Sequence, residues 1–278
     1  MNPLISAQEL AQLLQQPQAP ILLDVRWSLG RDDGAERYAA GHIPGAVFAD
    51  LERELSSAPG PGTGRHPLPM PEDFQAAARS WGINDDSQVV VYDDAGALSA
   101  ARAWWLLKHA GFEQVQVLDG GLDAWRQLPG AELASGAEHN ALGLVNLSWG
   151  RMPVVEFEDL GSIAGTLIDS RATARYLGIE EPIDPVAGHI PGARNRPTTD
   201  NLDSQARFLP AAALRSEFQK LGAQDGAVAY CGSGITAAHQ VLAAAVAGID
   251  MGLYPGSWSE YVTHPEAPVA TSDEQHRH

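Results

Sequence analysis

The sequence is poor in cysteine: its 278 residues include only one, Cys231. A single thiol excludes an internal disulfide framework, a cysteine-rich metal site and a second cysteine that could resolve an intermediate within the chain. We therefore expect no metal site, and any thiol chemistry has to pass through Cys231.

Basic residues are also scarce, with 18 Lys and Arg against 35 Asp and Glu and a net charge of −17. This charge would repel a phosphate backbone or an anionic bilayer, so neither nucleic acid nor a membrane is an expected partner. The sequence lacks a membrane-spanning apolar run and a basic-then-apolar leader, which makes the cytoplasm the expected location. The apolar fraction of 44% is typical of a globular protein with a sizeable core.

The second half of the sequence repeats the first. The matching pairs are Ile21–Arg26 with Thr166–Arg171, Gly41–Ala46 with Gly188–Ala193, and Val89–Tyr92 with Val228–Tyr230. Their spacing far exceeds the roughly 20–50 residues of solenoid repeats, so it indicates a duplicated domain. We predict domains at residues 1–130 and 153–278, joined by a Gly-, Ala- and Ser-containing linker at residues 131–152.

Each half alternates short apolar runs with helix-like segments. In the first half the runs are 21–25, 89–92 and 115–118, and the helical segments are 6–14, 71–81 and 99–110. This alternation predicts an α/β fold, in which each domain has a parallel sheet with helices on both faces. Active sites of such sheets lie at the carboxyl ends of the strands.

Cys231 stands at such a position. It follows the apolar run Ala227–Tyr230 and precedes Gly232, Ser233 and Gly234, after which an Ala-, Val- and Leu-rich stretch predicts a helix. Backbone N–H groups of such a loop and the start of the helix favour an anion, and hence a thiolate. The alternative is an inert buried cysteine at a strand end. The flanking glycines favour the reactive thiol, because they let a ligand approach the backbone.

These motifs resemble the rhodanese family of sulfurtransferases. The resemblance rests on Asp-x-Arg, Gly-His-Ile-Pro-Gly-Ala, Tyr-Cys with its glycine-rich loop, and a late Gly-Ser-Trp. It implies two tandem rhodanese-like domains of which the second is catalytic, because Asp93 takes the place of the cysteine in the first. Within the family, the loop Cys-Gly-Ser-Gly-Ile-Thr is similar to that of 3-mercaptopyruvate sulfurtransferases.

The resemblance implies that Cys231 takes a sulfur atom from a small-molecule donor, becomes a persulfide and passes the sulfur to an acceptor, either cyanide or a thiol such as glutathione or thioredoxin. The expected donor is 3-mercaptopyruvate, and no metal or organic cofactor is implied. Thiosulfate is the alternative donor, and a non-enzymatic sulfur carrier or binding module is a further alternative. A cysteine phosphatase is disfavoured, because Ala237 stands where its phosphate-binding arginine would be needed.

The resemblance also implies roles for individual residues. Ser233 is expected to relay a proton to the leaving enolate, and its alternative is a loop hydroxyl bonded to its own backbone. Arg175 is expected to bind the donor carboxylate, because a guanidinium pairs bidentately with a carboxylate. The expected substrate-binding residues are Arg175, Gly232, Gly234, Ile235, Thr236, Glu52 and His66. For Thr236, a helix cap is the favoured interpretation.

The sequence departs from the family pattern at two places. The loop 180–187 lacks the second arginine that mercaptopyruvate enzymes usually carry there, and Arg194 or Arg196 could take its place. Glu52 stands where the family has an aspartate. His66 matches a family histidine at the domain interface, with a loop histidine as the alternative.

Residues that occur in both halves are interpreted as structural, because only one half has a cysteine. They are the ion pairs Asp24–Arg26 and Asp169–Arg171 and the histidines His42 and His189.

Overall fold

The computed structural model describes residues 2–271, which form two compact units. The first unit comprises residues 2–57, 68–152 and 204–208, and the second comprises residues 58–67, 153–203 and 209–271. Residues 131–152, predicted as a linker, thus group with the first unit. They contain no helix or strand, but their backbone is bonded to it, for example through Val145 N–H and Ile83 O at 3.1 Å.

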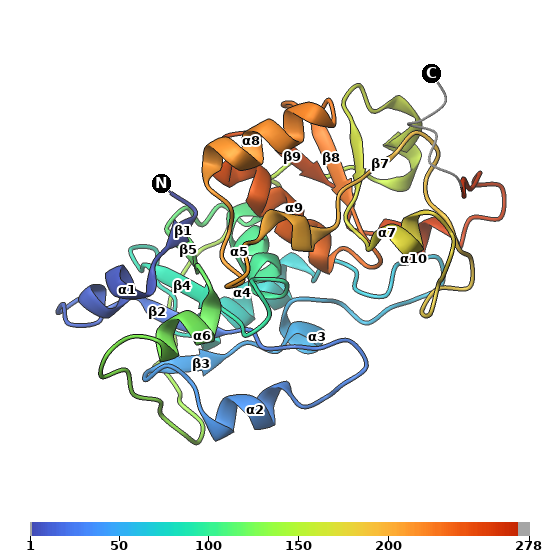
Figure 1. The fold of residues 1–278 in the computed structure, drawn as a ribbon. Helices are drawn as coiled ribbons and strands as arrows, with labels where there is room; N and C mark the ends of the chain where they lie inside the picture. The colour runs from blue at the N-terminus through green and yellow to red at the C-terminus, as the bar shows by residue number, and fades with distance from the viewer. Residues whose placement is uncertain (1, 272–278) are drawn as a thin grey trace. The chain divides into compact units, whose positions relative to one another are not determined.

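The described part of the first unit holds a parallel sheet of five strands in the order β1-β5-β4-β2-β3 (Figure 1). The strands are β1 (Leu4–Ile5), β2 (Ile21–Asp24), β3 (Ala46–Phe48), β4 (Val89–Tyr92) and β5 (Val115–Leu118). All four residues of β4 are buried, as expected for a valine-rich strand that is covered on both faces.

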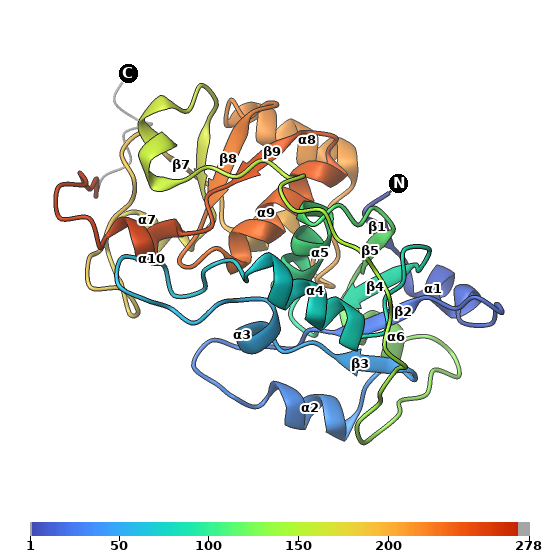
Figure 2. The same ribbon diagram turned by 180° about the vertical axis from the view of Figure 1, so that it is seen from behind.

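Helices cover both faces of this sheet. They are α1 (Ala7–Leu13), α2 (Gly34–Ala40), α3 (Leu51–Glu54), α4 (Pro71–Ser80), α5 (Ala100–His109) and α6 (Gly121–Arg126). Leu10 of α1 and Trp125 of α6 pack with Leu22 and Val90 of the sheet. Helix α5 packs on β4 and β5. Figure 2 shows α4 in front of the same sheet.

In the second unit, the described residues form a parallel sheet in the order β7-β6-β8-β9. The strands are β6 (Leu167–Asp169), β7 (Arg194–Asn195), β8 (Ala227–Tyr230) and β9 (Met251–Leu253). The α-helices are α7 (Thr173–Tyr176), α8 (Ala211–Lys220), α9 (Ile235–Val246) and α10 (Ser257–Tyr261), and the 3-10 helices are η1 (Phe157–Ser162) and η2 (Thr198–Asn201).

The two faces of this sheet are covered by different helices. Tyr176 of α7 and Trp258 of α10 pack with Val228 and Tyr230 of β8. Helix α9 packs on β8 and β9 and also contacts α8. The predicted α/β fold, with a parallel sheet and helices on both faces in each half, is therefore confirmed. Among residues 2–271, no helix combines the length and the apolarity needed to cross a membrane.

The repeated motifs form the same contacts in both units. The buried Arg171 guanidinium donates through Nε and Nη2 to the Asp169 carboxylate, and through Nη2 to the backbone oxygen of Gly188 at 2.6 Å. The corresponding residues in the first unit are Arg26, Asp24 and Gly41. Each ion pair thus joins a strand end to the Gly-His-Ile-Pro motif. Burial lowers the pKa of the Arg171 guanidinium, but the Asp169 carboxylate outweighs this effect and holds the pKa above its usual range.

Candidate active site

Cys231 lies directly after β8, at the carboxyl end of the strand, and is 1% exposed. The N–H of Gly234 donates to its Sγ at 3.2 Å. Gly234 is also the N-cap of the 12-residue helix α9 and has a left-handed φ of 81°. The thiol sulfur therefore faces a backbone donor at the positive end of a helix, which stabilises a negative charge there. Burial by itself also fits an inert cysteine, whereas the N–H contact is what the predicted reactive thiol requires.

The start of α10 fixes the backbone of the cysteine loop. Cys231 N–H donates to Ser257 Oγ at 3.1 Å, and the carbonyl oxygen of Cys231 accepts a hydrogen bond from Trp258 N–H at 2.9 Å. The carbonyl of Gly232 accepts from Ser259 N–H at 2.9 Å. Ser257 has a positive φ of 55°, which is uncommon for a residue with a side chain. The loop is thus held in one geometry by three hydrogen bonds from one neighbouring turn.

Ser233, two residues after Cys231, forms a buried pair with His66. His66 Nδ1 is hydrogen-bonded to Ser233 Oγ at 2.8 Å, and the two residues are 4% and 7% exposed. The serine hydroxyl is therefore held by an imidazole. This contact favours the functional interpretation of Ser233 over a hydroxyl bonded only to its own loop.

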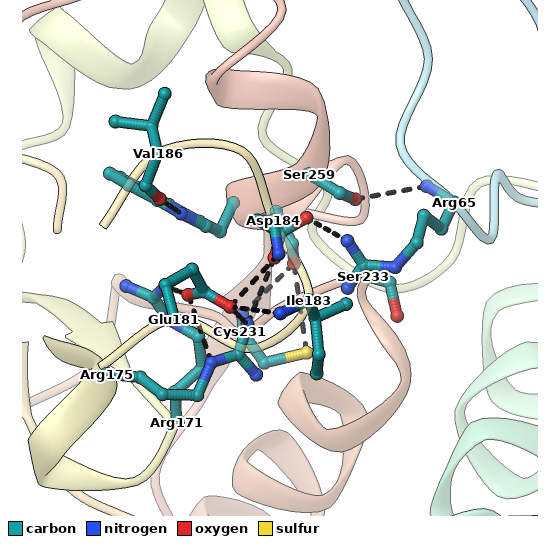
Figure 3. Close-up of polar contacts among 12 residues, drawn as sticks. Arg65, Arg171, Arg175, Glu181, Ile183, Asp184, Val186, Cys231, Ser233 and Ser259 are labelled. Atoms are coloured by element: carbon teal, nitrogen blue, oxygen red, sulfur yellow. Dashed lines mark hydrogen bonds and ion pairs between the residues drawn. The ribbon is translucent and has the colours of Figure 1, made fainter. Parts of the chain in front are cut away.

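Residues 58–67 bring His66 into the second unit and are anchored beside α10. Arg65 N–H donates to Ser259 Oγ at 3.0 Å (Figure 3). A Cβ on Gly64 would lie 2.5 Å from the carbonyl oxygen of Gly256, so only glycine allows this close approach. The segment thus rests on the same turn that holds Cys231.

Arginines and carboxylates cluster next to this loop. Arg175 donates to both Glu181 oxygens, at 2.7 and 3.1 Å, and through Nη2 to Asp184 Oδ2 at 3.0 Å. Arg65 Nη1 donates to the other oxygen of Asp184. One carboxylate, that of Asp184, therefore bridges two guanidinium groups (Figure 3). Burial raises the pKa of Glu181, but its hydrogen bonds, above all those from Arg175, outweigh burial and lower the pKa below its usual range.

Both bridged arginines approach Gly232. A Cβ on Gly232 would lie 3.1 Å from Arg65 Nη2 and 3.6 Å from Arg175 Nη1. The missing side chain therefore leaves room for two cationic groups directly after Cys231. This geometry can hold an anionic ligand beside the thiol.

The other loop residues predicted to contact the donor lie at the start of α9. Ile235 is its first residue and is 2% exposed. Thr236 is the second residue of the helix, so its favoured interpretation as the cap was wrong. The N-cap is Gly234, two residues earlier, so the hydroxyl of Thr236 stands in the first turn of the helix and not at its cap.

The remaining candidates are Glu52, Arg194 and Arg196. Glu52 is an exposed residue of α3 in the first unit, where its carboxylate accepts a hydrogen bond from Trp27 Nε1 at 2.8 Å. Arg194 is exposed on β7. Arg196 donates to Asn201 Oδ1 at 2.8 Å and to the backbone of η2. The structure thus uses Arg196 to hold a loop, and neither arginine provides the second cation at Gly232.

Arg65 and Asp184 are absent from the predicted site residues. The signal for Arg65 was its position directly before His66. Asp184 lies in the loop 180–187, from which a second arginine is missing. The second cation is therefore Arg65, which lies far from the loop 180–187 in the sequence. That loop carries the carboxylate of Asp184 where the family pattern predicts an arginine.

In the first unit, the loop after β4 has the carboxyl group of Asp93 in place of a thiol. Asp93 is fully buried, and its carboxylate accepts hydrogen bonds at 2.9 Å from the backbone N–H groups of Ala95, Ala97, Ser99 and Ala100. This loop is longer than the one after β8, but both end at a helix start. The duplicate thus shows that a loop at this place in the fold can direct four backbone N–H groups toward buried acceptor oxygens.

Among residues 2–271, the structure brings together no group of three His, Cys, Asp or Glu side chains suited to a metal ion.

Comparisons with known proteins place the chain in a family. The family of rhodanese-like domains matches residues 6–128 and 156–264. A probable 3-mercaptopyruvate sulfurtransferase of Pseudomonas aeruginosa is 46% identical over 97% of this chain and 98% of its own length. A putative thiosulfate sulfurtransferase of Mycobacterium tuberculosis is 44% identical over 96% of each chain.

The fold agrees with solved structures as well. The crystal structure of SseA from Escherichia coli, described as a 3-mercaptopyruvate sulfotransferase, matches with a TM-score of 0.80 and 35% identity over 93% of this chain and 100% of that chain. Because the family matches both halves and these relatives align over nearly their whole length, the chain belongs to the rhodanese family, as its motifs predicted.

Proposed function

We propose that this protein is a sulfurtransferase that moves a sulfur atom from 3-mercaptopyruvate to a thiophilic acceptor through a persulfide on Cys231. The observation that carries the proposal is the single thiol at the start of α9, with a hydrogen-bonded serine and two guanidinium groups beside it. Relatives with this activity in their names, aligned over nearly the whole chain, bear out the predicted enzyme class and donor.

The reaction balances without an external oxidant or reductant. The Cys231 thiolate attacks the sulfur of mercaptopyruvate, an S–S bond forms, and the C–S bond breaks with its electron pair moving to the enolate of pyruvate. The proton of the donor thiol ends on the methyl carbon of pyruvate, so the products are a persulfide anion and pyruvate. The acceptor then attacks the outer sulfur and releases the thiolate.

The buried carboxylate of the first unit supports this use of the loop. Each Asp93 oxygen is two bonds from Cβ, as the outer sulfur of a cysteine persulfide would be. Four backbone N–H groups donate to these oxygens. A strand-to-helix loop of this fold can therefore surround an atom two bonds from Cβ with hydrogen-bond donors, which stabilise an anion. We propose that the loop after Cys231 stabilises the persulfide in the same way.

Ser233 is the proposed proton relay. Its hydroxyl lies in the cysteine loop and is hydrogen-bonded to the imidazole of His66. Proton delivery to an enolate leaving group is general acid catalysis, which contributes roughly a hundredfold or more. Sulfite, the leaving group of thiosulfate, needs no such proton. A comparison of the sulfur donors mercaptopyruvate and thiosulfate therefore distinguishes proton relay by Ser233 from a structural role of Ser233 in the loop.

We expect Ser233→Ala to lower kcat with mercaptopyruvate about a hundredfold and to change kcat with thiosulfate little. Steady-state kinetics with both donors measure this difference. His66→Gln should lower kcat in the same direction, and the double variant should be no slower than the slower single variant, because both residues act in one relay. Equal losses with both donors would mean that Ser233 only supports the loop.

The donor itself is tested by comparing kcat/KM for mercaptopyruvate and thiosulfate in the unmodified enzyme. We expect the value for mercaptopyruvate to be higher. Mass spectrometry should show the gain of one sulfur atom on incubation with donor and its loss on addition of cyanide. A higher kcat/KM for thiosulfate would favour the alternative donor, which the name of the Mycobacterium tuberculosis relative supports. A persulfide that no acceptor discharges would favour a non-enzymatic carrier.

The acceptor and the location stay predictions. Cyanide, glutathione and thioredoxin are the candidate acceptors, and their rates of discharging a preloaded Cys231 persulfide rank them. We propose a cytoplasmic location, because a reducing compartment keeps the catalytic thiol free. Cell fractionation tests it.

A further inference from the structure

Two guanidinium groups flank the residue that follows the catalytic thiol. Arg65 Nη2 and Arg175 Nη1 lie 3.1 and 3.6 Å from the position that a Cβ on Gly232 would take. Arg65 Nε is buried and has no hydrogen-bond partner among the described residues. A buried N–H donor on a cation that lacks an acceptor costs free energy, and a ligand that accepts its hydrogen bond removes this cost. The side chain of Arg65 is thus equipped to bind an anion at this place.

Asp184 limits the positive charge of the pair. Its carboxylate, 3% exposed, accepts from both guanidinium groups at once. The loop that carries it is pinned by Glu181, whose Oε1 accepts the N–H groups of Ile183 and Asp184, both at 3.1 Å. Glu181 in turn pairs with Arg175 and Arg171. Two arginines at Gly232 therefore face two fixed carboxylates, and the local charge is close to neutral.

From this cluster we propose that Arg65 is a second guanidinium that binds the carboxylate of the sulfur donor, and that Asp184 tunes the pair to select a monoanionic donor over a dianionic one. The proposal rests on the proposed function, whose donor is the monoanion mercaptopyruvate. It extends that function to the residues that set donor specificity.

The selection follows from Coulomb's law. Asp184 repels any anion bound beside Gly232, and the repulsion is proportional to the charge of the anion. A dianion such as thiosulfate therefore suffers about twice the repulsion free energy of a monoanion. Rates depend exponentially on free energy. If removal of the Asp184 charge raises kcat/KM for the monoanion by a certain factor, it should raise kcat/KM for the dianion by the square of that factor.

The first test is Asp184→Asn, which removes the charge at nearly constant volume. If kcat/KM for mercaptopyruvate rises by about tenfold, that for thiosulfate should rise by about a hundredfold, and their ratio should shift toward thiosulfate. A variant whose loop was merely loosened would lower both values together. An unchanged ratio, or one that shifts toward mercaptopyruvate, would overturn the role of Asp184.

The second test is Arg65→Gln, which keeps a hydrogen-bond donor for Asp184 and removes the cation. We expect kcat/KM for mercaptopyruvate to fall about ten- to a hundredfold, mainly through KM, as for the loss of a charge-assisted hydrogen bond. Arg65→Lys should recover part of this loss. Arg215→Gln, at an exposed arginine of α8, is the matched control and should leave kcat/KM unchanged. Equal values for the Arg65→Gln and Arg215→Gln variants would overturn the role of Arg65.

The experiments distinguish a failure of the proposed roles of Arg65 and Asp184 from a failure of the proposed function. If unmodified enzyme loads sulfur faster from thiosulfate, the proposed donor is wrong, but the shift of the ratio in Asp184→Asn still tests the selection. If the enzyme prefers mercaptopyruvate and neither variant alters the rates or their ratio, the proposed function stands and the present inference fails.

Discussion

Replacing Cys231 with serine is expected to abolish sulfur transfer and to leave the fold intact. The hydroxyl of serine is a far weaker nucleophile toward sulfur at neutral pH, so kcat should fall by roughly four powers of ten or more. Serine can still accept the N–H of Gly234 that now reaches Sγ at 3.2 Å. The free energy of unfolding should therefore change by no more than about 2 kcal/mol.

The single thiol makes this experiment unambiguous. Because Cys231 is the only cysteine, intact-protein mass spectrometry reports the loading of one site, and the variant should gain no sulfur with either donor. Thermal unfolding monitored by circular dichroism establishes that the variant is folded. Cyanide-dependent turnover by the folded Cys231→Ser variant would refute the assignment of the nucleophile.

The sequence predicted the strand ends and the position of Cys231 well, because both depend on local pattern. The apolar runs at 89–92 and 115–118 coincide with β4 and β5. The position of Cys231 after β8 follows from the same pattern, together with the glycines that close the loop. In a buried parallel strand, continuous apolar composition is a strong signal that needs no tertiary information.

Short helices gave weaker signals. Helices α2, α3 and α6 were not predicted, since four to seven residues give only a weak periodic pattern. Helix α1 is equally short, but its capping box of Ser6 and Glu9 marks its start in the sequence. The segment 131–152 has no regular structure, which explains its interpretation as a linker. Its hydrogen bonds to the first unit depend on tertiary contacts that composition does not reveal.

The arginine cluster was the main feature of the site that sequence reasoning could not assemble. Arg65 and Asp184 are separated by 119 positions, and they meet because residues 58–67 of the first half fold into the second unit. The loop 180–187 contains no arginine, because the second guanidinium at Gly232 belongs to Arg65. Residue type and spacing find groups that share a loop, but they do not find partners brought together by a segment exchanged between units.

The second large effect is expected from Gly234→Ala, which should remove activity and destabilise the second unit. A Cβ at this position would lie 2.2 Å from the carbonyl oxygen of Pro255, a backbone atom that cannot rotate away. The left-handed φ of 81° adds a cost of about 1–2 kcal/mol for any residue with a side chain. We expect a total loss of about 3 kcal/mol or more in the free energy of unfolding.

Gly226→Ala is the matched control for this effect. Gly226 has a similar φ of 86°, but a Cβ there meets nothing within 4 Å, so it should cost only the conformational strain of about 1–2 kcal/mol and keep full activity. The difference between the two variants in denaturant unfolding isolates the clash with Pro255. Gly234 carries both contacts, so a shift of this residue away from Pro255 also displaces its N–H from the Cys231 sulfur. The Gly234→Ala variant should therefore load sulfur far more slowly than the Gly226→Ala variant under conditions in which both are folded. Equal loading would show that the anion at Cys231 does not depend on this backbone donor.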